Sequence, residues 1–297
     1  METRGIMGGF YRFSEWVMRF SAINLLWIIS SSPVLAALWI FSAWTAQIDD
    51  FTRYLGWWLV LGFVCILNAF TFVPASSAMF AVARKWVMGD VDVPLWRTYW
   101  KSYKANYKQS LYGGLLFSLF LGIFLFNIHY YSTVGNVLNS LALTFIVMIV
   151  LLFAAFLNFL SIMSHLHMST FQIVKNSFLI TIGQPINTLI LLVLNAGIVY
   201  ISILYNFLIV FFMGSVMAMI SFWNFYRGFT KIQARFKKSE EDEEEEEEES
   251  DDSDDSEESE DSDGEWTEAD PAEENPARLP AEKDENLEDE PSREERK

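Results

Sequence analysis

Few side chains in this sequence have the type and spacing that a catalytic or metal-binding site requires. His165 and His167 are the most suggestive pair, because two neighbouring imidazoles can bind a metal ion. On a helix, positions two apart lie about 200° around the axis, so both rings could reach one ion only if the backbone were extended. No third Cys, His, Asp or Glu stands nearby, and Cys65 is the only cysteine. We therefore expect no metal site, no disulfide and no cofactor.

Motifs of common enzyme sites are also absent from the sequence, which contains no GxxxxGK[ST], GxGxxG, HExxH, CxxC or GxSxG. The apolar segments that could cross a membrane contain no Asp, Glu, Lys or Arg. Proton- or ion-coupled pumps commonly need such a group at membrane depth, so coupled transport is disfavoured. We expect a protein that is not an enzyme and has no catalytic residues.

Neutral amides are the main polar groups that the apolar segments hold. Interhelical hydrogen bonding is their ordinary role in a membrane. They could instead line a route for a neutral polar solute such as a sugar, which would make the protein a facilitator or permease subunit. The amides in question are Asn24, Asn68, Asn158, Gln184, Asn187 and Asn195.

A helix predicted over about residues 94–110 combines an aromatic face with a basic flank, because both residue types recur every three or four positions. Such a helix is typical of the lipid headgroup layer, where each basic residue contributes about 1 kcal/mol near anionic lipid. The alternative interpretation is that it docks a transporter or another membrane-protein partner. Nucleic acid is not expected, because a segment so close to two spans cannot follow a duplex. The candidate docking residues are Trp96, Arg97, Trp100, Lys101, Lys104 and Lys108.

The candidate residues described above must be positioned by the helices that the long uncharged runs of the sequence form. Gln109–Val174 contains 66 residues and Asn176–Tyr226 contains 51, each without Asp, Glu, Lys or Arg. One membrane crossing takes about 20 apolar residues, so each run can hold two crossings and a turn. The predicted fold is an all-α polytopic membrane bundle with about six transmembrane helices, at residues 22–44, 54–83, 111–128, 141–162, 186–204 and 207–225.

Small residues at four-residue spacing predict where these helices pack closely, because they let two backbones approach. The candidate packing residues are Gly114, Ser118 and Gly122 in the third span, and Gly214 and Ala218 in the sixth. Pro33 and Pro74 each predict a bend within a span. The excess length of the second span is expected to be accommodated at Pro74.

Basic residues predict the orientation of the bundle. If both termini are cytoplasmic, the clusters at residues 4–19, 84–108 and 227–238 share one side with Lys175, and only Arg53 lies on the other. With five spans, the basic cluster at residues 227–238 would lie on the extracellular side. Six spans is therefore the better interpretation.

The last 59 residues, 239–297, form a second physical unit. They carry a net charge of −27, whereas residues 1–238 carry +10. A near-continuous Glu run followed by Asp/Ser repeats cannot bury enough apolar area to offset chain entropy, so we expect a disordered acidic tail. The first interpretation is a solvated tail. It could also bind divalent cations weakly, or fold back as a charged chain onto the positively charged surface of residues 1–238.

The order of several features resembles the YesL-like family of bacterial membrane proteins of unknown function. These features are Asn24–Trp27 followed by Pro33, then Pro74 and Ala75, then Trp96–Ser110. The resemblance covers approximately residues 5–235, and the acidic tail departs from it. It implies a small multi-pass protein of the bacterial plasma membrane, with lipids around it and an accessory or scaffold role in carbohydrate uptake. It supplies no catalytic residue.

Overall fold

The computed structural model describes residues 6–45, 50–134 and 139–257, and every element assigned there is a helix. The chain divides into two compact units, residues 1–238 and 239–297, at the point where the charge changes sign. Six helices are long and apolar enough to cross a membrane, at residues 8–41, 58–87, 95–133, 140–165, 185–204 and 209–239. The prediction of an all-α membrane bundle with six spans is confirmed.

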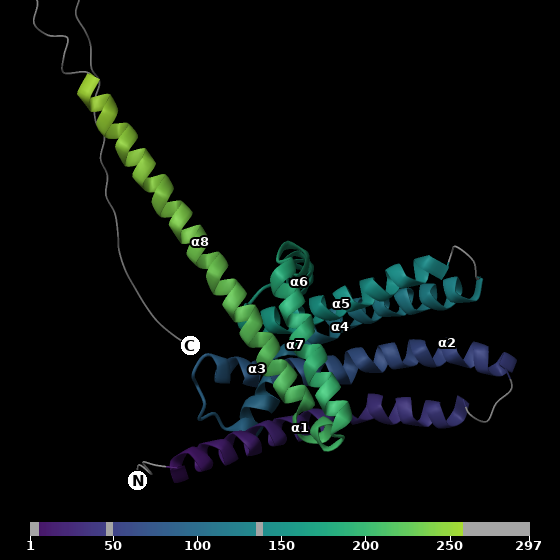
Figure 1. The fold of residues 1–297 in the computed structure, drawn as a ribbon. Helices are drawn as coiled ribbons and strands as arrows, with labels where there is room; N and C mark the ends of the chain where they lie inside the picture. Colours follow the sequence, from purple (N-terminus) through teal and green to yellow (C-terminus); the bar gives the residue numbers. More distant parts are fainter. Residues whose placement is uncertain (1–5, 46–49, 135–138, 258–297) are drawn as a thin grey trace, which may run out of the picture. The chain divides into compact units, whose positions relative to one another are not determined.

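The helices follow one another through short connections. The elements are α1 (Ile6–Thr45), α2 (Asp50–Leu67), the π-helical η1 (Asn68–Phe72), α3 (Val73–Val87), α4 (Leu95–Val134), α5 (Asn139–His165), α6 (Thr170–Gly183), α7 (Pro185–Leu204), the π-helical η3 (Ile209–Met213) and α8 (Gly214–Glu257). In the unit of residues 1–238, α1, α2, α4 and α5 run roughly alongside one another, while α7 and α8 lie across them (Figure 1).

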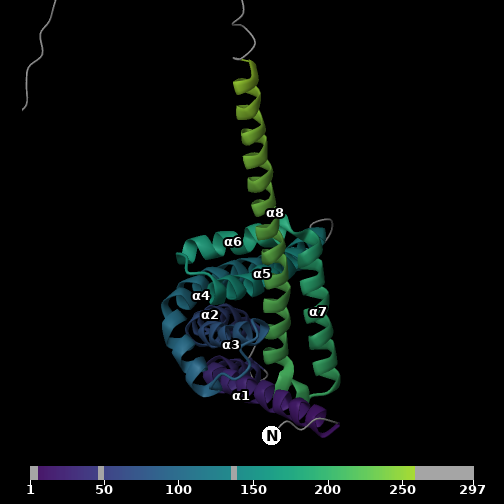
Figure 2. The same cartoon turned by 90° about the vertical axis from the view of Figure 1, so that its left-hand side faces the viewer.

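The core of this unit is built around α3, which Figure 2 shows enclosed by α1, α4, α5 and α8. Every residue from Val73 to Phe80 is buried. Several of them are Ala or Ser, and such small side chains let the surrounding helices approach closely without a hydrophobic driving force from water. Phe159, Tyr99 and Phe222 fill the space between the helices and are fully buried.

The second span contains a change of helix geometry that was not predicted. The expected bend lies at Pro74, but the helix changes to π-helical geometry over Asn68–Phe72, and Pro74 occupies the first turn of α3. The helix is continuous here, so Pro74, which has no N–H to donate, leaves a carbonyl of the preceding π-helical turn without its helical partner. The span then continues to Val87, four residues beyond the predicted end.

The predicted interfacial helix and the third span are one continuous helix, α4, of 40 residues. The prediction had separated them near residue 110, where the charges end. Neither Pro nor Gly stands between Leu95 and Tyr112, so nothing local interrupts the helix. The basic segment is thus a rigid extension of a span.

A tight turn closes α3 and leads back to α4. Gly89 adopts a left-handed φ of +94°, its N–H donates to the carbonyl of Trp86, and the N–H of Asp90 donates to the carbonyl of Lys85. This pair of bonds is the Schellman arrangement, which satisfies the last carbonyls of a helix and favours glycine at the left-handed position.

The first part of the acidic segment is helical: α8 continues to Glu257. A disordered tail was predicted to begin at Ser239, so residues 239–257 are more regular than expected. Glutamate has a good helix propensity, which explains continuation of the helix through the Glu run. Residues 258–297 of the predicted tail lie outside the described residues, as do residues 135–138 of the predicted turn between the third and fourth spans.

Candidate functional site

The aromatic face of α4 packs into the protein over much of its length. Tyr99 is fully buried, and its hydroxyl donates to the backbone carbonyl of Ala75 in α3, at 3.3 Å. Trp100 and Tyr103 pack against the same core. Trp96, one turn earlier, is 65% exposed. Of the two predicted docking tryptophans, Trp96 therefore offers the open surface, whereas Trp100 helps to fasten α4 to the core.

The basic flank of α4 is exposed along its full length. We call Arg97, Lys101, Lys104 and Lys108 the cationic ridge: their spacing of four, three and four residues places them on one helix face, and all four are exposed. Ion pairs in the described part of the bundle join other groups, such as Arg19 with Glu15 and Asp92, and Lys85 with Asp90. The ridge is thus a row of exposed positive charge that attracts anionic groups.

Contacts near the ridge bring other basic segments to the same end of the bundle. Arg19 of α1 donates to Asp92, at 2.9 Å, and to the carbonyl of Val91, both in the segment before α4. Arg84, near the end of α3, donates to the carbonyl of Ser164, at 2.8 Å, near the end of α5. A cation at this position satisfies a terminal carbonyl and complements the helix dipole. Arg19 and Arg84 therefore lie near the end of the bundle at which α4 begins.

The predicted packing stripe of α4 divides into two parts. A Cβ placed on Gly114 would lie 3.0 Å from the Cα of Ala69, so the backbones of α4 and η1 nearly touch there. One turn later, Ser118 accepts a hydrogen bond from Asn68, at 2.9 Å. A Cβ on Gly122 would meet nothing within 4 Å. The close approach therefore involves Gly114 and Ser118 and ends before Gly122.

The predicted packing residues of the sixth span lie at the start of α8, and both are buried. A Cβ on Gly214 would lie 2.8 Å from Oδ1 of Asn24, and Ala218 is fully buried. A further close contact that was not predicted lies at Gly113, where a Cβ would lie 2.1 Å from the ring of Phe159. The adjacent glycines at positions 113 and 114 could have indicated this contact. Gly113 faces α5, whereas Gly114 faces η1 and α3.

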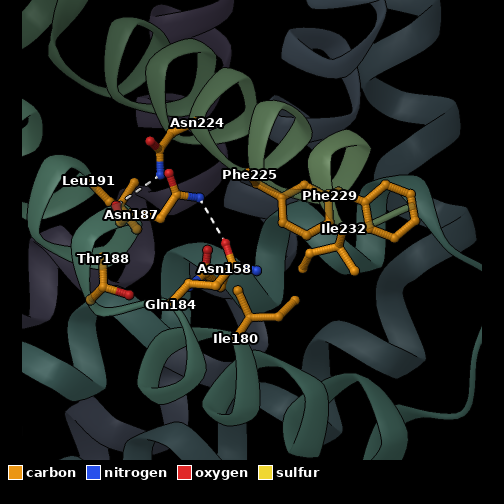
Figure 3. A pocket seen from close by; sticks show the side chains of 10 residues that line it. All are labelled: Asn158, Ile180, Gln184, Asn187, Thr188, Leu191, Asn224, Phe225, Phe229 and Ile232. Carbon is orange, nitrogen blue, oxygen red and sulfur yellow. Dashed lines mark hydrogen bonds between the residues drawn. The ribbon is translucent and has the colours of Figure 1, made fainter. Parts of the chain in front are cut away.

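An amide cluster lies between α5, α6, α7 and α8 (Figure 3). Asn158 donates to the hydroxyl of Thr181, at 2.9 Å. Asn187 donates to Oε1 of Gln184, at 3.1 Å, and Asn224 donates to the carbonyl of Asn187, at 3.2 Å. The structure thus brings together three amides that the sequence had singled out separately. Asn224 was missed, although it is the one amide near the end of an otherwise apolar run.

The space enclosed at this amide cluster is small. Its volume is about 20 Å³, enough for a single water molecule, which needs roughly 10–15 Å³. Phe225, Phe229 and Ile232 of α8 form the apolar part of its wall together with Ile180 and Leu191. The amide groups bond to each other or to neighbouring helices, so this geometry serves helix association and offers little room for a sugar.

The two histidines of the H-x-H pair lie in different surroundings. The ring of His165 packs edge-on against four aromatic rings of α8, those of Phe222, Phe225, Tyr226 and Phe229, with centroids 5.5–6.3 Å away. His167 is exposed beyond the end of α5. No group of three His, Cys, Asp or Glu that could hold a metal ion occurs among the residues of 6–45, 50–134 and 139–257.

Comparison with known proteins gives one family match and several relatives. Residues 20–128 match the family described as a protein of unknown function, DUF624. The chain is 24% identical over 241 residues to the uncharacterized protein YesL of Bacillus subtilis (strain 168), covering 79% of this chain and 96% of YesL. It is 33% identical over 99 residues to the uncharacterized protein YteU of the same organism, but this match covers only 33% of the chain and 30% of YteU.

A third relative is the uncharacterized protein YesV of Bacillus subtilis (strain 168), which is 29% identical over 167 residues, covering 56% of this chain and 80% of YesV. No solved structure matches the chain. All three relatives are described as uncharacterized, so they supply a family resemblance and no activity.

Proposed function

We propose that this chain, a member of the YesL-like family of proteins of unknown function, is a non-enzymatic accessory membrane protein that docks a partner protein on its cationic ridge. The main support for this proposal is the position of the ridge. Its four basic side chains are exposed, and the opposite face of the same helix is held against the core by the buried Tyr99. Such a rigid row of charge suits an acidic surface on the partner, because complementary potentials guide association and set register.

The orientation of the ridge follows from the contacts between the basic segments. Arg19, Arg84 and the ridge belong to different helices but lie toward the same end of the bundle. Basic residues concentrate on the cytoplasmic side of membrane proteins, so we place this end, with both termini, in the cytoplasm of a bacterial cell. A cytoplasmic ridge is accessible to a membrane-protein partner and to soluble proteins.

The family resemblance implies a role in sugar acquisition, and the partner proposed here is accordingly a carbohydrate-uptake transporter of the same membrane. The amide cluster provides only about 20 Å³, which supports an accessory role better than passage of a sugar through this chain. The proposed activity is therefore protein docking.

Neutralising the ridge should strongly reduce capture of the partner. Exposed charge pairs contribute about 0.2–1 kcal/mol each, so removing four should weaken binding by about fourfold to several hundredfold. The tagged full-length chain is captured from gently solubilised membranes of its own host, and co-purifying proteins are quantified by mass spectrometry at low and high salt. The ridge variant carries Arg97→Gln, Lys101→Gln, Lys104→Gln and Lys108→Gln.

A matched control removes the same number of exposed positive charges elsewhere, through Lys175→Gln, Arg227→Gln, Lys231→Gln and Arg235→Gln. The proposal expects a reproducible partner with the wild type and the control, and strongly reduced capture with the ridge variant or at high salt. Equal capture by both variants, or recovery of the wild type without any reproducible partner, would count against docking on the ridge.

A further inference from the structure

A large apolar cavity lies in the middle of the bundle, away from the ridge and from the amide cluster. Its volume is about 490 Å³, and its walls come from α1, η1, α3, α4, α5, α7, η3 and α8. Most lining side chains are Phe, Leu, Met, Ile or Val. Buried residues such as Phe117, Leu157 and Leu160 form its inner wall, while Phe153 is 38% exposed at its outer side.

The few polar groups in the wall are already paired with one another. Trp27 donates its indole N–H to the hydroxyl of Ser76, at 3.0 Å. Asn68 donates to the hydroxyl of Ser118, at 2.9 Å. Each pair engages one N–H and one hydroxyl oxygen, and apolar side chains far outnumber these four polar ones in the wall. The chemistry of the wall therefore favours a hydrocarbon.

Both π-helical segments of the described chain border this cavity. Asn68 and Phe72 of η1 line it on one side, and Met213 of η3 lines it on another. π-Helical turns in membrane and soluble helices frequently occur at functional sites. Met79, Met213 and Met217 also face the cavity, and methionine side chains adapt to the shape of a flexible ligand.

We infer that this cavity is a binding site for one acyl chain of a bilayer phospholipid. A cavity of about 150 Å³ can hold benzene, so 490 Å³ is large enough for a hydrocarbon about three times that size. The lining residues of α1, η1, α3, α4 and α5 fall within the interior of helices that are apolar enough to cross a membrane, where acyl chains form the surrounding solvent. A chain inserted there restores the contacts that an empty cavity lacks.

Photolabelling in lipid nanodiscs tests this site. The full-length chain is reconstituted with a phospholipid that carries a diazirine near the end of one acyl chain, irradiated, and mapped by peptide mass spectrometry. Adducts are expected on Phe117, Leu157 and Leu160, which lipid outside the bundle cannot reach because they are at most 5% exposed. Adducts confined to outward-facing residues such as Leu119 would overturn the proposal.

A filled cavity provides the control. Val199→Trp adds a large side chain inside the cavity, whereas Val193→Trp adds the same group on the exposed face of the same helix, α7. Adducts on the inner wall should disappear with Val199→Trp and persist with Val193→Trp. Met217→Trp, from α8, repeats the test if Val199→Trp does not fold. Unchanged labelling of the inner wall in every folded variant would contradict occupation of the cavity by the acyl chain.

Discussion

Replacing Gly114 by leucine should strongly destabilise the membrane unit. A Cβ at this position would already lie 3.0 Å from the Cα of Ala69 and 3.0 Å from Cγ2 of Val73, and leucine adds three further carbons. The Ala69 atom belongs to the backbone, so relief requires α4 to move away from η1 and α3. Overpacking of this kind typically costs about 1–3 kcal/mol, and we expect the upper end of that range or loss of folding.

Gly122→Leu is the matched control, because it makes the same change on the same helix where nothing lies within 4 Å. Thermal unfolding in detergent, followed by circular dichroism and gel filtration, compares the two variants. A melting temperature near that of the wild type is expected for Gly122→Leu and a large decrease for Gly114→Leu. Equal melting temperatures would show that α4 does not approach η1 as closely as described.

Replacing Asn24 by leucine should produce the second large loss of stability. Asn24 is fully buried, and its amide donates to the carbonyls of Ile209 and Val210, at 3.0 and 2.6 Å. Its oxygen accepts from the N–H of Ser215, at 3.2 Å. One side chain thus joins α1 to η3 and the start of α8.

Leucine has a similar size but can make none of these three hydrogen bonds. Interhelical bonds in a membrane contribute about 0.6 kcal/mol each, and a buried group left unsatisfied costs about 1–3 kcal/mol, so a total loss of about 2 kcal/mol or more is expected. Asn127→Leu is the control, since Asn127 bonds only within its own helix, to Ile123. Similar melting temperatures for the two variants would refute a special role for Asn24.

The number of spans could be predicted from the sequence because it depends on the lengths of uncharged runs and on the distribution of basic residues. The π-helical segments could not, since no composition or spacing distinguishes Asn68–Phe72 or Ile209–Met213 from ordinary helix. Continuity of α4 was missed because the change from basic to apolar residues was interpreted as a boundary. No Pro or Gly between Leu95 and Tyr112 interrupts the helix at this change of composition.

The cationic ridge could be predicted because the helical period alone places Arg97, Lys101, Lys104 and Lys108 on one face. Burial of the aromatic face could not be predicted, because Tyr99 is buried against α3, whose position is set by tertiary packing. The same holds for the amide cluster, in which Asn187 and Asn224 are 37 residues apart. Local pattern identifies polar residues in a span but does not show which of them meet.

Accessibility of the ridge from the two sides of the membrane tests the central claim most directly. Cys65 is the only thiol, so a Cys65→Ala background allows one cysteine at a time to report its position. Ala105→Cys places a thiol among the ridge residues, and Ser132→Cys places one near the far end of the same helix; both positions are exposed. With a membrane-impermeant thiol reagent, Ser132→Cys should be labelled in intact cells and Ala105→Cys only after the membrane is opened. Labelling of Ala105→Cys in intact cells would place the ridge outside and contradict its role as a cytoplasmic docking surface.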